Sequence, residues 1–336
     1  MKLNPRLPKG KAKIILGSLF LVALLIVITI EILSKSHITE QSTLELKAQE
    51  NKFNLSFNLT NQDQKKAESL ISKLALPSNL LSGAQFELDS TNSARLSFSS
   101  PVYADLNIPE NQLHFNGTTS HPLLNTSFKP KNFKIPESAI INIFGANLQT
   151  FLLSRLNIPP ELNTWINQHL KKDSPQYLLI FNSSDMALLW QDPQIDFSTL
   201  KNINAKGTTY KEENQEDISY HLYKLPKNKQ GKETTMAFFN LNDFAIAATS
   251  AYSAKEIAKT IRSAENSRNS IDNTSETSYF LEFKNPQKKL DSNLKSVLFN
   301  DNGQSLPKEK IFNVLENISE FKLTLKGNSF SGLINW

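Results

Sequence analysis

Short stretches in which apolar and polar residues alternate recur along most of this chain. Phe53, Leu55, Phe57 and Leu59 occupy every second position of one such stretch. A period of two predicts a β-strand with one buried face. Pairs of such stretches, separated by a few polar residues, predict β-hairpins. The predicted hairpins join 86–88 to 96–98, 177–181 to 186–190, 236–241 to 244–248, and 321–325 to 330–333.

Apolar residues at a spacing of three or four predict helices between these strands. The predicted helices cover about 61–76, 148–156, 160–169, 253–261, 290–298 and 307–315. Pro160 suits the first turn of one helix. Ser253 and Glu256 form a capping box that predicts the start of another. Together these patterns predict an α+β fold in which antiparallel sheets pack with helices.

A different pattern near the N-terminus predicts a membrane anchor. Residues 14–30 read IILGSLFLVALLIVITI and carry no formal charge, and Ile32 and Leu33 extend the apolar segment. Twenty helical residues span about 30 Å, the thickness of a hydrocarbon core. A cleaved signal peptide has a shorter apolar core of roughly 7–15 residues and a small-residue exit. Residues 14–33 lack such an exit. The sequence therefore predicts an uncleaved transmembrane helix.

The basic charge of the chain belongs mainly to the flank of this helix. The net charge is +5, and five positive residues precede the apolar segment with no acid among them: Lys2, Arg6, Lys9, Lys11 and Lys13. The remainder is formally neutral, so no nucleic-acid partner is predicted. A positive N-terminal flank predicts a cytoplasmic N-terminus and an extracytoplasmic bulk.

Cysteine is absent from the sequence. Its absence excludes thiolate nucleophiles, redox pairs and cysteine-based metal sites. In an extracytoplasmic region of this size it favours a bacterial envelope protein over a eukaryotic secreted one.

The composition of successive stretches and the positions of turn residues predict six parts along the chain. They are a cytoplasmic basic tail (1–13), the anchor (14–33), a polar stalk (34–50) and three α+β segments (51–130, 131–266 and 267–336). The third segment is expected to pack with the second. The polar stretch 264–276 is predicted to be a mobile loop.

Two stretches of the second segment read FKIPESAIINIFGANLQTFLLSRL and, downstream, FFNLNDFAIAATSAYSAKEIAKTI. They resemble a family of bacterial single-pass membrane proteins of unknown function, and the closing FKLTLKGNSFSGLINW is similar in style to that family. The resemblance implies a membrane-tethered α+β ectodomain. It implies no active site, because the family has none established.

The search for catalytic and metal-binding patterns assigns no site residue and no cofactor. None of the five histidines (His37, His114, His121, His169 and His221) forms a ligand pair at helical spacing. His114 and His121 could face each other across a turn, but no carboxylate lies between them. Two S-x-x-K matches lack their partner motifs.

Acidic residues gather in two places. Glu212, Glu213, Glu216 and Asp217 form a run that lacks the order of a calcium loop and is predicted to be a solvated loop. Asp185, Asp192 and Asp196 lie around Trp190, where sequence alone cannot place a glycosidase pair.

Three functions stay open at this level. The leading hypothesis is a non-catalytic envelope protein that binds or scaffolds another envelope component, and it predicts an exposed apolar patch or an open sheet edge. A wall- or peptide-processing hydrolase would instead need converging carboxylates or a serine near a histidine. A carrier of a lipid or hydrophobic ligand would need an apolar cavity.

Overall fold

The computed structural model describes residues 43–49, 52–58, 84–88, 93–98, 102–107, 112–119, 126–154, 156–181, 185–191, 195–227, 233–271, 275–287, 290 and 315–336. They form two compact units. Unit 1 draws on residues 1–126, 285–289 and 299–336, and unit 2 on 127–284 and 290–298. The segment predicted at 267–336 is thus shared, because its first strand lies in unit 2 and its last two lie in unit 1.

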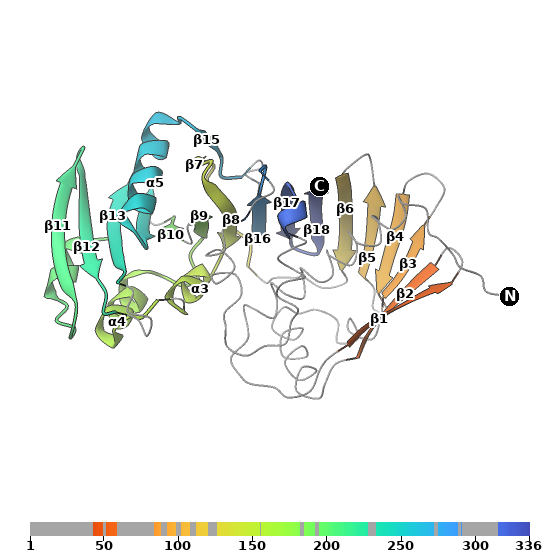
Figure 1. The fold of residues 1–336 in the computed structure, drawn as a ribbon, viewed down its shortest axis with the longest axis horizontal. Helices are drawn as coiled ribbons and strands as arrows, with labels where there is room; N and C mark the ends of the chain where they lie inside the picture. Colours follow the sequence, from red (N-terminus) through yellow and green to blue (C-terminus); the bar gives the residue numbers. More distant parts are fainter. Residues whose placement is uncertain are drawn as a thin grey trace. The chain divides into compact units, whose positions relative to one another are not determined.

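Unit 1 is an antiparallel sheet whose described strands follow the order β1-β2-β3-β4-β5-β6-β18-β17. Figure 1 draws β1 to β6 as successive neighbours. The strands are β1 Thr43–Gln49, β2 Lys52–Asn58, β3 Ala84–Leu88, β4 Ser93–Phe98, β5 Val102–Asn107, β6 Gln112–Thr119, β17 Glu320–Lys326 and β18 Ser329–Asn335. The predicted hairpins β3–β4 and β17–β18 are confirmed. Strand β1 lies in the stretch predicted as a stalk.

One face of unit 1 is buried where side chains are described. Val102, Ala104 and Leu106 of β5 are buried, and the residues between them are exposed. Leu113 and Phe115 continue this face on β6. The alternation expected of a half-buried strand is therefore present in β5.

The strands of unit 2 are also antiparallel and follow the order β16-β8-β9-β10-β14-β13-β12-β11. Its strands are β8 Ala139–Gly145, β9 Gln176–Phe181, β10 Met186–Trp190, β11 Thr209–Gln215, β12 Ile218–Lys224, β13 Thr235–Leu241, β14 Phe244–Ala248 and β16 Tyr279–Lys284. A short pair, β7 Lys134–Pro136 and β15 Ser267–Asn269, lies apart from it. The predicted hairpins β9–β10 and β13–β14 are confirmed.

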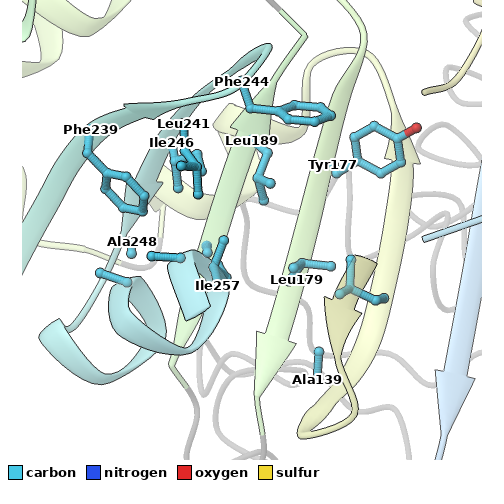
Figure 2. Packing of buried hydrophobic residues seen from close by; sticks show 14 of the residues in the cluster. Ala139, Tyr177, Leu179, Leu189, Phe239, Leu241, Phe244, Ile246, Ala248 and Ile257 are labelled. Atoms are coloured by element: carbon cyan, nitrogen blue, oxygen red, sulfur yellow. The ribbon is translucent and has the colours of Figure 1, made fainter. Parts of the chain in front are cut away.

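The central strands of unit 2 are buried on both faces. Every residue of β9, β10 and β14 is buried. On one face, Leu179, Leu189 and Ile246 pack in a cluster with Ile257 of helix α5 Ala251–Ser263, as Figure 2 shows. Helices account for the continuous apolar runs of these strands, because a sheet covered on both sides leaves no polar face.

The opposite face is covered by helix α3 Leu148–Ser154, helix α4 Pro160–His169 and the 3₁₀-helix η2 Phe197–Asn202. Trp165 of α4 lies 6.2 Å from Phe238 of β13, measured between ring centroids. Phe197 of η2 lies 5.7 Å from the same ring. Phe238 and Phe239 are neighbours on one strand, so their side chains point to opposite faces of the sheet.

Two local predictions in unit 2 are wrong. Helix α5 begins after Ser250, whose side chain accepts a hydrogen bond from the N–H of Ser253, so the cap lies three residues before the predicted capping box. The polar stretch 264–276 includes strand β15, and Ser270 within it is fully buried. Two of its polar side chains bind partners on other segments: Arg268 pairs with Glu282, and Ser270 Oγ accepts from the N–H of Phe133.

Several predictions concern residues outside those described. They include the anchor at 14–33, the helix at 61–76 and most of the helix at 307–315. Within the described ranges, no helix is both long and apolar enough to cross a membrane. The coarse prediction of antiparallel sheets with a few helices is confirmed.

Candidate functional site

Strand β11 is the last strand in the order of the unit 2 sheet, and Figure 1 draws it beside β12 at one end of that unit. It pairs with β12 through seven facing residues. Its residues are exposed except for Tyr210, which is half-buried. A two-residue turn joins the strands, and Glu216 and Asp217 both have positive φ, at 51° and 62°. The acidic run predicted to be a solvated loop is therefore an edge strand that ends in a tight hairpin turn.

The register decides which backbone groups of β11 point away from the sheet. Gln215 faces Ile218 across the turn, and facing pairs in an antiparallel ladder alternate between bonded and non-bonded. The backbone N–H of Leu225, just beyond β12, binds the carbonyl of Thr234 at 2.8 Å, so odd-numbered residues of β12 face β13. The even-numbered residues of β12 therefore bond to β11.

It follows that Tyr210, Glu212 and Asn214 direct their backbone N–H and C=O groups away from β12. No hydrogen-bond partner for these groups occurs among the residues that the structure describes. An unpaired row of this kind is a template for another strand.

The side chains of the same residues line one face of the hairpin. The Tyr210 hydroxyl lies 2.8 Å from Nδ1 of His221 on β12. It also donates a long hydrogen bond, 3.4 Å, to Oε2 of Glu212. The Tyr210 and His221 rings are stacked with an interplanar angle of 25°. These contacts fix the position of the Tyr210 ring beside the open edge.

His221 packs against a cluster of aromatic side chains. Phe197 lies 6.2 Å from the His221 ring and 5.9 Å from the Trp165 ring. The Trp165 indole N–H donates to the Thr199 hydroxyl at 3.0 Å. His221 itself is 7% exposed. These contacts therefore pack the His221 side of the hairpin against η2 and α4.

Burial sets the protonation of this pair. Loss of solvation lowers the pKa of His221, more strongly than the nearby carboxylates of Glu212 and Asp196 raise it. Burial also raises the pKa of the Tyr210 hydroxyl, and Glu212 adds to this effect. Both rings are neutral at pH 7, so their hydrogen bond joins two uncharged groups.

Two ion pairs involve other acidic residues of β11 and its turn. Lys211 Nζ lies 2.6 Å from Oε1 of Glu213, on the face opposite Glu212. An Arg262 nitrogen on α5 lies 3.2 Å from Oε2 of Glu216 in the turn. For Glu212, the structure gives no lysine or arginine nitrogen within 4.0 Å among the described residues. Its carboxylate lies at the centre of the open edge, without a cation beside it in the part of the chain that the structure describes.

The other candidates from the sequence are not brought together. His114 lies in unit 1, where Nε2 is 3.1 Å from Oε1 of Gln112. His169 stacks on Trp165. Asp196 caps η2 by accepting from the N–H of Ser198, and hydrogen bonding by the side chain and then the backbone of Ser198 lowers the pKa of its carboxyl group. His37, His121 and Asp192 lie outside the described ranges.

The described residues include no group of three or more histidines and carboxylates that could hold a metal ion. The described histidines hydrogen-bond a glutamine, a tyrosine and a backbone carbonyl, rather than a serine or a carboxylate.

Sequence reasoning missed the open edge because β11 reads TYKEENQ and lacks the alternation of a half-buried strand. A signal was present in its neighbour, since Ile218, Tyr220 and Leu222 alternate directly after the acidic run. A strand that begins two residues after another polar stretch indicates a tight hairpin.

No model of a known protein family, no curated protein and no solved structure matches this chain.

Proposed function

We propose that this chain is a membrane-anchored bacterial envelope protein whose unit 2 binds an extended segment of another envelope polypeptide. The observation that carries the proposal is the open edge of β11. Tyr210, Glu212 and Asn214 each direct one backbone donor and one backbone acceptor outward. An added strand would form hydrogen bonds with these outward groups, as β12 does with the backbone groups of the intervening residues of β11.

The hairpin is suited to this role because it is held in place before binding. His221 and Tyr223 on β12 are buried. The Tyr223 hydroxyl lies 3.1 Å from that of Thr208, just before β11. Binding to a fixed edge avoids the entropy cost of ordering a loop.

The proposed role is non-catalytic. Support comes from the described histidines, whose hydrogen-bond partners include no serine and no carboxylate. A binding protein needs no such constellation, whereas a hydrolase does.

Residues 14–33 supply the proposed anchor, and the positive flank before them supports a cytoplasmic N-terminus. Both units then lie outside the cytoplasm. Removing residues 1–33 is expected to shift the chain from the membrane to the soluble fraction. If the shortened chain still sediments with membranes that carbonate cannot strip, the anchor proposal is wrong.

Photo-crosslinking in intact cells tests the binding role. A photoreactive amino acid replaces Lys211, whose side chain on β11 is exposed. The expected result is a discrete crosslinked polypeptide. The same amino acid at Lys259, exposed on α5, serves as the position control and is expected to give no such product.

Asn214→Pro distinguishes strand addition from side-chain contact. Proline removes an outward N–H while leaving the backbone ladder to β12 intact, because the backbone groups of Asn214 do not bond to β12. Both the proline and the threonine variant lose the hydrogen bond of 2.6 Å that Ser219 Oγ donates to Oδ1 of Asn214. The crosslink from position 211 is expected to disappear in Asn214→Pro and to persist in Asn214→Thr. A crosslink that survives the proline shows that the partner does not use the edge, and the proposal fails.

A further inference from the structure

We infer that the segment which adds to β11 is basic, with a lysine or arginine opposite Glu212. This inference rests on the proposed function and narrows its partner to one chemical class. It follows from the charges on the edge and from which of them already have partners.

The hairpin edge is acidic. Residues 209–217 contain one lysine and four acidic residues, a formal charge of −3. The residues of this stretch are exposed, except for Tyr210, which is half-buried. A charged edge of one sign attracts an extended segment of the other sign and repels one of the same sign.

Glu212 is the acid on β11 that is available to a partner; Asp217, which also has no ion pair within 4.0 Å among the described residues, lies in the turn and not on the strand. Glu213 is bound to Lys211, and Glu216 is bound to Arg262. Glu212 accepts only the long hydrogen bond of 3.4 Å from Tyr210 among the contacts of the described residues. Its backbone groups also point outward, so an added strand places one residue directly opposite it.

The half-buried ring of Tyr210 adds a second favourable feature. Tyr210 and Glu212 lie two residues apart on the same face of β11, so a residue that faces Glu212 directly has Tyr210 as a diagonal neighbour. The stacked His221 ring and the hydrogen bond to Nδ1 hold the tyrosine in this position. A cation opposite Glu212 therefore meets a carboxylate and an aromatic ring together.

A second copy of this chain fits the edge less well. Antiparallel pairing of two β11 strands through Tyr210, Glu212 and Asn214 places Glu212 opposite its own copy. Like charges directly opposite each other destabilise a strand pair. The observations therefore favour a different, basic polypeptide.

Fluorescence anisotropy with the full-length chain in detergent tests the inference. The probe is a labelled seven-residue peptide in which lysine alternates with threonine. There are two matched control peptides. In the first, glutamate replaces every lysine. The second keeps the lysine sequence and carries N-methyl groups on alternate backbone nitrogens. The lysine peptide is expected to bind, and the other two are expected not to bind.

Substitutions then separate charge from strand addition. Glu212→Gln is expected to weaken the lysine peptide roughly two- to fivefold, the range of a single cross-strand charge pair. Glu161→Gln on α4 changes the net charge equally and is expected to leave binding unchanged. Raising the salt concentration is expected to weaken binding further, because salt screens exposed charges.

Three results would overturn the inference. Equal binding of the lysine and glutamate peptides removes the charge preference but leaves strand addition standing. Equal binding of the N-methylated peptide removes strand addition, and with it the proposed function. Binding of neither peptide, together with a dimer in sedimentation that Asn214→Pro dissociates, assigns the edge to a second copy of the chain.

Discussion

The guanidinium of Arg268 forms an ion pair with the carboxylate of Glu282 inside unit 2. Nε of Arg268 lies 3.0 Å from Oε2 of Glu282, and the two side chains are 10% and 4% exposed. Arg268 also donates to the carbonyls of Pro136 and Ala139. One side chain thus joins β15, β7, β8 and β16.

Removal of this guanidinium is expected to destabilise unit 2. Arg268→Met leaves a buried carboxylate and three carbonyl acceptors without their main donor. Breaking a buried pair in this way costs about 3 kcal/mol or more. Urea unfolding followed by the fluorescence of Trp165 and Trp190, both buried in unit 2, measures the loss.

Lys211→Met is the matched control, because it removes a cation from an exposed pair. Its unfolding midpoint is expected to stay close to that of the unchanged chain. If the two variants unfold at the same urea concentration, the interior pair does not hold β15 in place.

The hairpins of this fold were accessible from sequence because their signals are local. Residues 236–241 and 244–248 are apolar runs on either side of Asn242 and Asp243, and they form β13 and β14. Asn242 takes the turn with φ of 52°, a conformation that asparagine tolerates. Helix α4 likewise begins at Pro160, where proline needs no N–H partner.

The order of strands and the open edge depend on long-range contacts that local patterns do not contain. Strand β18 pairs with β6 in unit 1, although more than 200 residues separate them. Strand β11 gave no alternation because both of its faces are exposed. Arg268 looked like part of a mobile loop because its partner Glu282 lies on another strand.

Loss of the helix cap at Ser250 is expected to destabilise unit 2 by about 1 kcal/mol. The Ser250 hydroxyl accepts from the N–H of Ser253 at 3.1 Å, and Ser250→Ala removes this acceptor. Ser250→Asp keeps a capping oxygen and is expected to retain the stability. Urea unfolding monitored by circular dichroism compares the two, and equal losses would contradict Ser250 as the cap.

A methyl group at Gly332 is expected to destabilise unit 1. Gly332 faces Phe115 across β18 and β6, and an added Cβ would meet the Phe115 ring and the backbone carbonyl of Lys322. Overpacking of this kind costs about 1–3 kcal/mol. The fluorescence of Trp336, the tryptophan of unit 1, follows the unfolding of Gly332→Ala.

Gly327→Asn provides the comparison for this variant. Gly327 has φ of +54°, which asparagine tolerates, and an added Cβ would meet nothing within 4 Å. Its cost is expected to be smaller than that of Gly332→Ala. If Gly327→Asn instead destabilises unit 1 more than Gly332→Ala does, the Phe115 ring moves away from the added methyl group at no cost in stability.

The stability of unit 2 is expected to fall as the pH decreases below the ordinary histidine pKa of 6.5, because of His221. Burial lowers the pKa of His221 in the folded chain, so the unfolded chain takes up the proton first. The groups that face this ring are Tyr210, Glu212, Asp196 and Phe197, and the two carboxylates only partly offset burial.

His221→Gln removes this proton uptake, so its urea midpoint is expected to change less between pH 7.5 and pH 5 than that of the unchanged chain. The full effect of one proton is about 1.4 kcal/mol per pH unit, an upper limit here. His169→Gln, at an exposed position on α4, is expected to keep the original pH dependence. If His221→Gln keeps it as well, the folded chain accommodates a charged His221, and the pair with Tyr210 does not require a neutral ring.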